Sequence, residues 1–426
     1  MVRNILAELQ QFLLESPGCF HAVAALKHRL DAAGFTELRE SERWQLTPGQ
    51  GYYVSRNGSS LLSFRLPKCQ AESLHIIASH SDSPSFKLKP DPALWADGVL
   101  RLNVEGYGGM IRRSWFDRPL SVAGRVIIDD GGALRERLVY VDRDLLLIPS
   151  LAIHLSRDSA EAKTISVQNE LLPLLGLTSD AWARVLSDAA QVSADRILGA
   201  DLFLTCREKP TVWGADGEFL SAPRLDDLAC CYASFAGFLD AKPTSDIALH
   251  AVFDNEEVGS RSMQGAESDF LAATVRRILL ALGMDEEGMR AAIARSFLVS
   301  ADNAHALHPN YAGKYDLVSR PKMNGGIVLK RQAGQKYTTD AVGEAVFRAI
   351  CRKANVPVQD YANHSDVPGG STLGNISNTQ LSIRAVDIGL AQLAMHSAYE
   401  TMGSADATHL ARFAEAFYGM PLPKVE

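Results

Sequence analysis

Hydrophobic and polar positions in the first part of the chain predict two helices followed by strands. Apolar residues recur at helical spacing over residues 5–14 and 21–33, and Ser16-Pro17-Gly18 separates the two segments. Apolar runs that are typical of buried strands follow at residues 60–64 and 74–79. The first part of the chain is therefore predicted to contain both helices and strands, as in an α/β fold.

The pattern changes from about residue 90. Short β-rich runs cover residues 99–104, 120–128 and 134–141. Asp129-Asp130-Gly131-Gly132 between the last two runs predicts a β-hairpin. Short strands joined by polar turns favour an all-β or mixed insertion over repeated βαβ units.

Helical and strand patterns alternate again after about residue 222. Helices are predicted over residues 225–239 and 270–282, strands over 247–253, 297–300, 327–329 and 381–386, and residues 390–395 have a helical pattern. This alternation predicts an α/β fold with a mostly parallel sheet and helices on both faces. The simplest organisation is a main domain of residues 1–88 plus 222–426, interrupted by an inserted β-rich domain of residues 89–221.

Composition narrows the class of protein. With 46% hydrophobic and 22% charged residues, the 426-residue chain has the composition of a soluble globular protein. A net charge of −7 argues against binding to nucleic acid, and no apolar stretch approaches the length of a membrane span. The N-terminal segment predicts an amphipathic helix and not a signal peptide. Six scattered cysteines without a CxxC motif suit a reducing compartment, so we expect a cytoplasmic protein.

Side chains that can bind metal ions follow four of the predicted strands. They are His80 and Asp82 after residues 74–79, Glu256 and Glu257 after 247–253, Asp302 after 297–300, and His396 ten residues after 381–386. In open α/β sheets, ligands bind beyond the carboxyl ends of the strands. Histidines and carboxylates gathered there predict a metal site with nitrogen and oxygen ligands.

Each candidate alone has a simpler structural explanation. Asp302 by itself would be a turn residue, and Asp226 and Asp227 begin a predicted helix, where carboxylates also cap the helix. The combination favours a two-ion site, because two divalent ions need a bridging carboxylate, further ligands and a separate acid that takes the proton of the water. Adjacent Glu256 and Glu257 can serve as that acid and as a ligand, since neighbouring side chains at a strand end point in different directions.

Five motifs together resemble those of the aspartyl aminopeptidase family. They are Ala78–Pro84, Pro223–Leu228, Asp254–Ser260, Ser300–Asn310 and Ala394–Ser397, and they occur in this order from near the N-terminus to the last predicted helix. The resemblance implies two divalent metal ions, zinc or alternatively cobalt or manganese. It also implies a β-rich inserted dimerisation domain and a homo-oligomer of twelve subunits built from dimers.

The resemblance also assigns roles to individual residues. The implied metal ligands are His80, Asp226, Glu257, Asp302 and His396. Asp226 would bridge the ions, with Asp227 as the alternative. Glu256 would be the general base that activates the water, and Asp82 would orient the first histidine.

Two further matches concern the substrate. His154, within Ser150–Leu155, resembles a family histidine that reaches a neighbouring subunit's active site. There it would act as an oxyanion donor or as a metal-site histidine. The alternative is that His154 only packs within the inserted domain. Lys330 matches a basic substrate-binding residue of the family. Lys336 replaces a family arginine, and this change loses bidentate recognition of a carboxylate.

We therefore expect a metal-dependent aminopeptidase that acts on peptides and prefers acidic N-terminal residues. A neutral-residue aminopeptidase or an N-acyl deacylase on the same metal scaffold is the nearest alternative. A non-catalytic metal-binding assembly protein is the alternative from another class, and the presence of Glu256 argues against it. The sequence has no HExxH motif, which disfavours single-zinc proteases.

Overall fold

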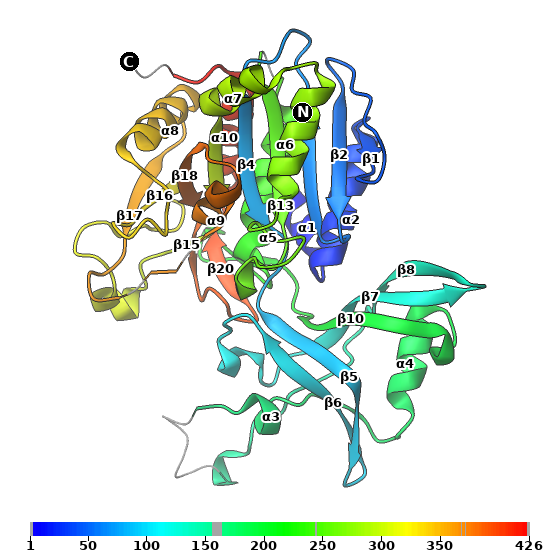
Figure 1. Ribbon diagram of the computed structural model, residues 1–426. Helices are drawn as coiled ribbons and strands as arrows, with labels where there is room; N and C mark the ends of the chain where they lie inside the picture. Colours follow the sequence, from blue (N-terminus) through cyan, green and yellow to red (C-terminus); the bar gives the residue numbers. More distant parts are fainter. Residues whose placement is uncertain (1–2, 156–163, 243–244, 368, 371, 424–426) are drawn as a thin grey trace.

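A nine-stranded sheet forms the main body of the protein (Figure 1). The computed structural model describes residues 3–155, 164–242, 245–367, 369–370 and 372–423. In order across the sheet, the strands are β1 (Thr36–Leu38), β2 (Gly51–Arg56), β3 (Ser60–Arg65), β13 (Ile247–Phe253), β4 (Leu74–His80), β14 (Phe297–Ala301), β18 (Arg384–Gly389), β16 (Ile327–Arg331) and β17 (Val358–Ala362).

The four central strands of this sheet run parallel to one another. Strand β4 pairs in parallel with β13 and with β14, and β14 pairs in parallel with β18. The direction reverses on both flanks, where β3 is antiparallel to β13 and β16 is antiparallel to β18. The prediction of a mostly parallel sheet is confirmed, and the carboxyl ends of the four central strands meet at one edge.

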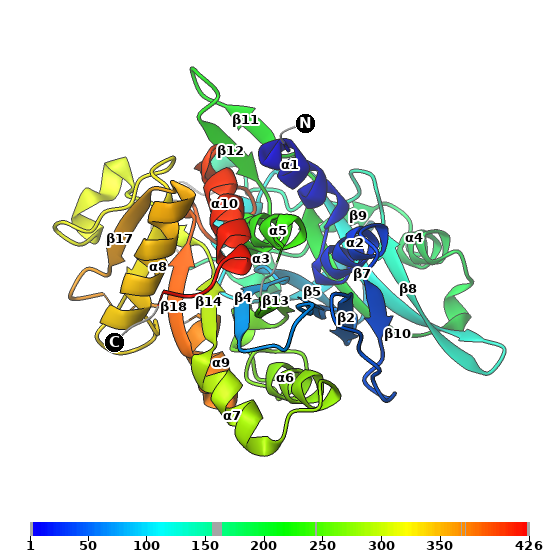
Figure 2. The same cartoon turned by 90° about the horizontal axis from the view of Figure 1, so that it is seen from above.

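Helices cover both faces of the sheet, as predicted (Figure 2). One face packs against α1 (Ile5–Glu15), α2 (Cys19–Ala32), α5 (Leu225–Asp240), α8 (Ala341–Ala354) and α10 (Asp406–Gly419). The other face packs against α6 (Phe270–Ala281), α7 (Glu286–Arg295) and α9 (Leu373–Gln380). In the part of the chain that the structure describes, no helix is long and apolar enough to cross a membrane.

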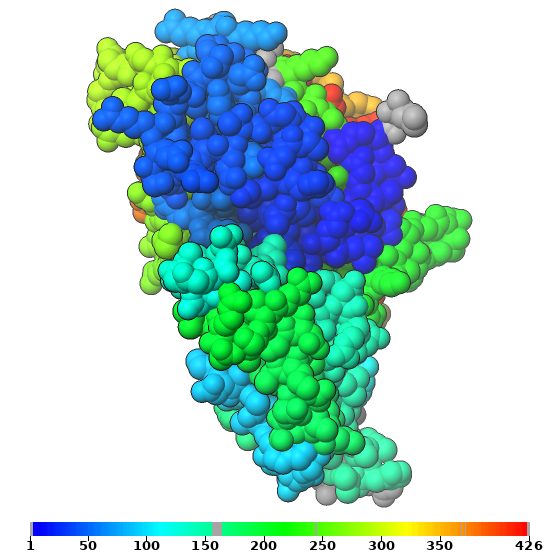
Figure 3. All heavy atoms as spheres, turned by 90° about the vertical axis from the view of Figure 1, so that its right-hand side faces the viewer, coloured from blue at the N-terminus to red at the C-terminus, as the bar shows by residue number. Residues whose placement is uncertain are grey.

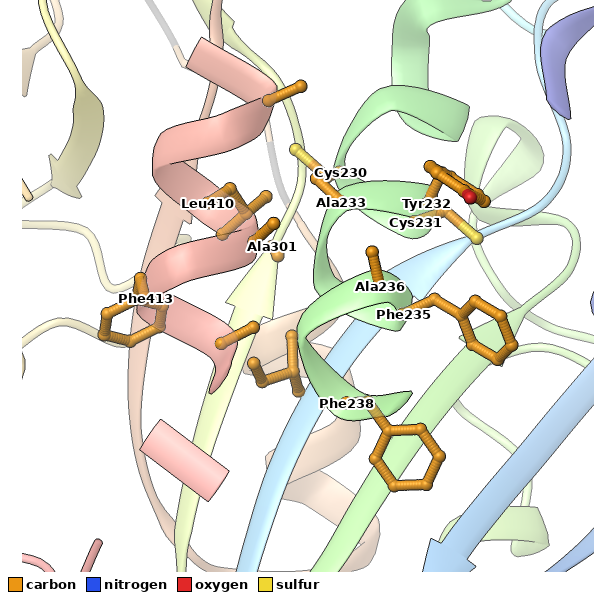
Figure 4. Packing of buried hydrophobic residues seen from close by; sticks show 14 of the residues in the cluster. Cys230, Cys231, Tyr232, Ala233, Phe235, Ala236, Phe238, Ala301, Leu410 and Phe413 are labelled. Atoms are coloured by element: carbon orange, nitrogen blue, oxygen red, sulfur yellow. The ribbon is translucent and has the colours of Figure 1, made fainter. Parts of the chain in front are cut away.

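Helix α5 is the most deeply buried of these helices, and its N-terminal end lies at the carboxyl edge of the sheet. It lies beside α10 (Figure 4), and the ring of Phe238 in α5 packs against the ring of Tyr418 in α10, with centroids 5.4 Å apart. A Cβ atom at Gly237 would lie 2.4 Å from the carbonyl oxygen of Ala411 in α10, so only glycine permits this close approach. The packing fixes the N-terminal end of α5, which carries Asp226.

A second, entirely antiparallel sheet forms a lobe below the main body (Figure 3). Its strands are β8 (Ala133–Tyr140), β7 (Leu120–Asp130), β10 (Ile197–Cys206), β5 (Ser85–Ala96), β6 (Val99–Tyr107) and β9 (Leu174–Gly176). The predicted hairpin is present, since Asp130 pairs with Ala133 across β7 and β8. This sheet has its own apolar core, and the exact division into two domains stays a prediction.

A third sheet joins distant parts of the chain and corrects one expectation. Its strands are β11 (Thr211–Trp213), β12 (Phe219–Ala222), β20 (Glu400–Gly403), β19 (Ala391–Leu393) and β15 (Ala304–His305). The helix pattern over residues 390–395 was misleading: the segment is β19 followed by a turn in which Ala394 and His396 have positive φ. A short apolar run does not distinguish a buried strand from a helix by its spacing. Likewise, the strand predicted over 381–386 begins only at Arg384, because α9 extends to Gln380.

Candidate metal centre

The candidate ligands lie at the carboxyl edge of the central sheet. His80 is the last residue of β4, and Asp302 directly follows β14. Glu257 lies in a short 3₁₀ turn (Glu256–Val258) shortly after β13. His396 lies in the turn between β19 and β20, and Asp226 lies at the start of α5. The fold thus brings together residues from five separate segments of the chain.

Asp226 lies between the two histidines. Its Oδ1 is 3.6 Å from His80 Nε2, and its Oδ2 is 3.5 Å from His396 Nε2. Asp302 Oδ1 lies 3.9 Å from His80 Nε2, and Glu257 Oε2 lies 3.4 Å from His396 Nε2. Two groups of three ligand atoms therefore share Asp226, and within each group the atoms lie within 4.8 Å of one another.

The chemistry of these groups fits divalent cations. Asp226 Oδ1 and Glu257 Oε1 are buried and have no hydrogen-bond partner among the described residues. A buried carboxylate oxygen without a partner is costly, and a cation would provide one. Imidazole nitrogens and carboxylate oxygens at this spacing are the ligands that zinc binds in catalytic sites.

Hydrogen bonds from behind orient both histidines toward Asp226. His80 Nδ1 donates to the carbonyl oxygen of Asp82 at 3.0 Å, and His396 Nδ1 donates to the carbonyl oxygen of Gly109 at 2.6 Å. A carbonyl oxygen can only accept, so each Nδ1 carries a hydrogen. In the neutral ring, Nε2 is then the nitrogen without a hydrogen, and it is the one that faces the centre, as a metal ligand must.

Asp82 also holds the two adjacent glutamates. Its Oδ1 accepts a hydrogen bond from Glu256 N, and its Oδ2 accepts one from Glu257 N, both at 3.1 Å. The same residue thus fixes His80 and the backbone of both glutamates. This placement agrees with the orienting role expected of Asp82.

Burial and neighbouring charges shift the pKa values in the centre. Burial alone would raise the pKa of Asp226, but His396 and His80 outweigh it and hold that pKa well below its usual range. Burial alone would lower the pKa of His396, but Asp226 and its neighbours raise it to about 10. Burial raises the pKa of Glu256 to about 8, with His80 opposing the shift and Asp302 adding to it. The two histidines thus favour the anionic form of Asp226, whereas burial makes Glu256 a weaker acid than an exposed glutamate.

The structure distinguishes Asp226 from its neighbour Asp227. Asp227 is fully buried, and its Oδ2 accepts a hydrogen bond from the backbone nitrogen of His80 at 3.2 Å. It is absent from the groups of ligand atoms found among the described residues. The position between the two histidines belongs to Asp226.

Comparison with known proteins gives the family. Residues 12–418 match the family described as aminopeptidase I zinc metalloprotease (M18). The chain belongs to the M18 family. The resemblance to aspartyl aminopeptidases that the five motifs indicated is confirmed, and the protein is an aminopeptidase of the zinc metalloprotease class. This finding decides against the non-catalytic alternative.

Relatives of this M18 protein match it over nearly their whole length. A probable M18 family aminopeptidase 2 from Clostridium novyi is 40% identical over 424 residues, which cover 97% of this chain and 98% of the relative. Its counterpart in Pseudomonas aeruginosa (strain UCBPP-PA14) is 41% identical over 426 residues, with 97% and 98% covered. Among solved structures, the Ape4 and Nbr1 complex aligns with a TM-score of 0.94 at 35% identity, covering 97% of this chain and 85% of that chain. The S. cerevisiae mApe1 dodecamer aligns with a TM-score of 0.86 at 28% identity, covering 97% and 96%.

Lys330 lies in the wall of the M18 site, but its ammonium group is engaged. Its Nζ donates to the carbonyl oxygens of Asp302 at 2.7 Å and Asn303 at 3.2 Å, and it lies 3.6 Å from Asp302 Oδ2. Lys336 is further out, where its Nζ donates to the carbonyl oxygen of Gly369 at 2.9 Å. These contacts make Lys330 a residue that positions Asp302.

His154 is the one predicted site residue that the fold of a single chain does not bring to the centre. It lies in an exposed 3₁₀ turn, Ile153–Leu155, that follows strands of the six-stranded sheet. It is absent from the residues that line the cavity at the ligand groups. A role for His154 in the site of another subunit stays a prediction.

Sequence reasoning missed Glu400, which is buried behind the centre. Its Oε2 accepts a hydrogen bond from Asp226 N at 3.0 Å, and its Oε1 accepts one from His396 N at 2.6 Å. One side chain thus holds the backbone of the shared carboxylate and of the second histidine. Its position four residues after His396 gave no signal, because both contacts are to backbone nitrogens.

Proposed function

We propose that this M18 aminopeptidase hydrolyses the N-terminal peptide bond with the help of two divalent cations, of which zinc fits the family and the ligand atoms. The observation that carries the proposal is the position of Asp226, with one carboxylate oxygen near each histidine. A single-ion site has no need for such a shared carboxylate. Cobalt or manganese remain alternatives for the same ligand set.

The residues divide between the two ion positions. His80 and Asp302 would hold one ion, Glu257 and His396 the other, and Asp226 both. Bound there, the ions would lower the pKa of a water, polarise the scissile carbonyl and favour the ionised form of Glu256.

Glu256 would move the protons of the reaction. Its carboxylate lies within 4.8 Å of ligand atoms of His80 and Glu257, yet it belongs to neither group that shares Asp226. It is therefore placed to accept a proton from the attacking water at a carboxylate oxygen. The same carboxyl group would then donate that proton to the leaving amine nitrogen.

The cavity beside the centre suits the end of a peptide. It has a volume of about 160 Å³ and is lined by Lys330, Tyr337 and Tyr361 beyond the ligand groups. A second cavity of about 430 Å³ adjoins it and shares His305 and Tyr361, which offers room for the rest of a peptide. An N-acyl deacylase would have less use for this second space.

The cationic wall at Lys330 supports a preference for acidic N-terminal residues. A preference for neutral residues is the second candidate, because the Lys330 ammonium already donates to two backbone carbonyls. We further propose a dodecamer like that of the S. cerevisiae mApe1 structure, in which His154 reaches a neighbouring site. The cytoplasm is the proposed location, in keeping with the cysteine usage.

Hydrolysis of amino acid anilides by the zinc-loaded protein tests the proposal. We expect two ions per chain and release of aspartyl or glutamyl residues faster than leucyl or alanyl residues. N-acetyl amino acids should not be hydrolysed. Faster release of leucine would establish the neutral-residue alternative, and full activity with one ion per chain would refute the two-ion mechanism.

A further inference from the structure

A short segment outside the predicted ligand set contacts both halves of the metal centre. Residues 107–111 lie at the end of strand β6, in the six-stranded sheet, and continue to the edge of the main sheet. Tyr107 Oη donates a hydrogen bond to Asp82 Oδ2 at 2.7 Å. Two residues later, the carbonyl oxygen of Gly109 accepts from His396 Nδ1, and Ile111 N donates to the carbonyl oxygen of His396 at 2.9 Å. The segment thus reaches the supports of both histidines.

The Tyr107 hydroxyl has a defined direction. Asn255 Nδ2 donates to Tyr107 Oη at 2.9 Å, so the hydroxyl hydrogen is left to donate to Asp82. Asn255 is itself fixed, because its Oδ1 accepts from Ser262 Oγ at 2.7 Å and from Gln264 Nε2 at 2.8 Å. This chain of hydrogen bonds gives Asp82 Oδ2 a second donor beside the backbone nitrogen of Glu257.

Close contact at Gly108 keeps the segment against the glutamates. Gly108 has a φ of 75°, and a Cβ atom there would lie 3.1 Å from Glu257 Cβ and 3.4 Å from Pro84 Cα. Both the backbone conformation and the available space favour glycine. Any larger residue would move the segment away from the centre and lengthen its contacts to Asp82 and His396.

We propose that residues 107–111 form a positioning clasp, through which the six-stranded sheet sets the geometry of both histidines, with Tyr107 as its positioning side chain. This inference rests on the proposed two-ion function. Removing the Tyr107 hydroxyl takes away one of the two donors to Asp82 Oδ2 and leaves only the backbone nitrogen of Glu257 there. The Asp82 carboxylate, whose Oδ1 lies 3.3 Å from His80 Nδ1, is then held less firmly, so His80 and the two glutamates lose part of their alignment. Partners that orient metal ligands contribute about 10- to 100-fold to metal affinity.

Tyr107→Phe tests the clasp, and Tyr53→Phe is its matched control. Tyr53 Oη also donates to a carboxylate, Asp31 Oδ1 at 2.6 Å, on a strand near the other end of the sheet. We expect Tyr107→Phe to bind zinc about tenfold or more weakly in competition with a chelator, and to change the visible absorption of the bound cobalt ion. Tyr53→Phe should keep the wild-type affinity and spectrum. Melting temperatures of the chelator-treated proteins show whether either substitution disturbs the fold itself.

A glycine pair tests the close contact separately. Gly98, in the turn at the other end of β6, has the same φ of 75° and no atom within 4 Å of a Cβ built on it. Gly108→Ala and Gly98→Ala therefore carry the same backbone cost, but only the first meets the metal centre. We expect Gly108→Ala to weaken metal binding more than Tyr107→Phe, and Gly98→Ala to leave it unchanged.

The outcomes separate the clasp from the proposed function. Wild-type affinity and cobalt spectrum in Tyr107→Phe would overturn the clasp, whatever the activity. Loss of affinity in Tyr53→Phe to the same extent would also overturn it, because the effect would then be a general one. Fewer than two ions per chain in the wild-type protein would refute the two-ion function, while the affinity comparison would still decide the clasp.

Discussion

Replacing Glu256 by glutamine separates proton transfer from metal binding. The substitution keeps the size of the side chain and removes only its ability to accept a proton. Glu256 is outside both ligand groups that share Asp226, and its backbone nitrogen stays bound to Asp82 Oδ1. The two ions should therefore remain, and the chain should keep its local conformation.

The expected loss of rate follows from this position. General acid–base catalysis by one side chain contributes roughly 10²- to 10⁴-fold. Glu256 is placed both to accept the proton of the water and to return it to the amine, so we expect kcat to fall by about 10³-fold or more, within that range. KM should change far less than kcat, because the cavity walls at Tyr337 and Tyr361 are untouched.

Glu257→Gln is the matched control, because it changes the adjacent residue in the same way. Glu257 Oε2 lies 3.4 Å from His396 Nε2 in one of the two ligand groups, so this variant should lose affinity for one ion. Metal content by elemental analysis and steady-state rates on an amino acid anilide are measured for both variants. A Glu256→Gln variant that keeps most of its activity refutes the general-base role, and one that loses an ion makes Glu256 a ligand.

Three further predictions concern pH, Lys330 and assembly. Burial lowers the pKa of His250 to about 3, so its neutral form stabilises the fold fully above its unfolded pKa of about 6.5, and this stability is lost as the pH falls from there toward 3. At pH 5 the loss of stability is about 2 kcal/mol. The melting temperature of His250→Phe should therefore drop less between pH 7.5 and 5 than that of the wild type. An equal drop in the two proteins contradicts this reading. Lys330→Met should lower the melting temperature, since it leaves the buried carbonyls of Asp302 and Asn303 without their donor at a cost of about 1–3 kcal/mol each. The substitution should also reduce the rate of aspartyl hydrolysis relative to leucyl hydrolysis. An unchanged ratio would show that Lys330 does not determine the preferred N-terminal residue. Light scattering should find a particle of twelve chains whose activity falls on dilution, and a fully active monomer would exclude a shared role for His154.

The sequence alone determined the local elements and the identity of the candidate site. The strand predicted at residues 247–253 has the observed bounds, because a continuous apolar run between polar turns has few alternatives. The hairpin at Asp129–Gly132 was equally local. The family and the candidate ligands also followed from the sequence, because the motifs that carry them are short and occur in a fixed order.

Only the tertiary structure decided how the site is held. The sequence favoured Asp226 as the bridging carboxylate but left Asp227 open as the alternative. Packing around α5 places Asp226 between the histidines and Asp227 against the backbone of His80. The contacts of Tyr107 and Glu400 left no trace in the sequence. Tyr107 contacts Asp82 and Asn255, which are distant from it along the chain. Glu400 contacts the backbone nitrogens of distant Asp226 and of nearby His396, and every residue except proline possesses such a group. Side-chain chemistry can be deduced from the order of residues, whereas the hydrogen bonds that orient it depend on which segments the folded sheets bring together.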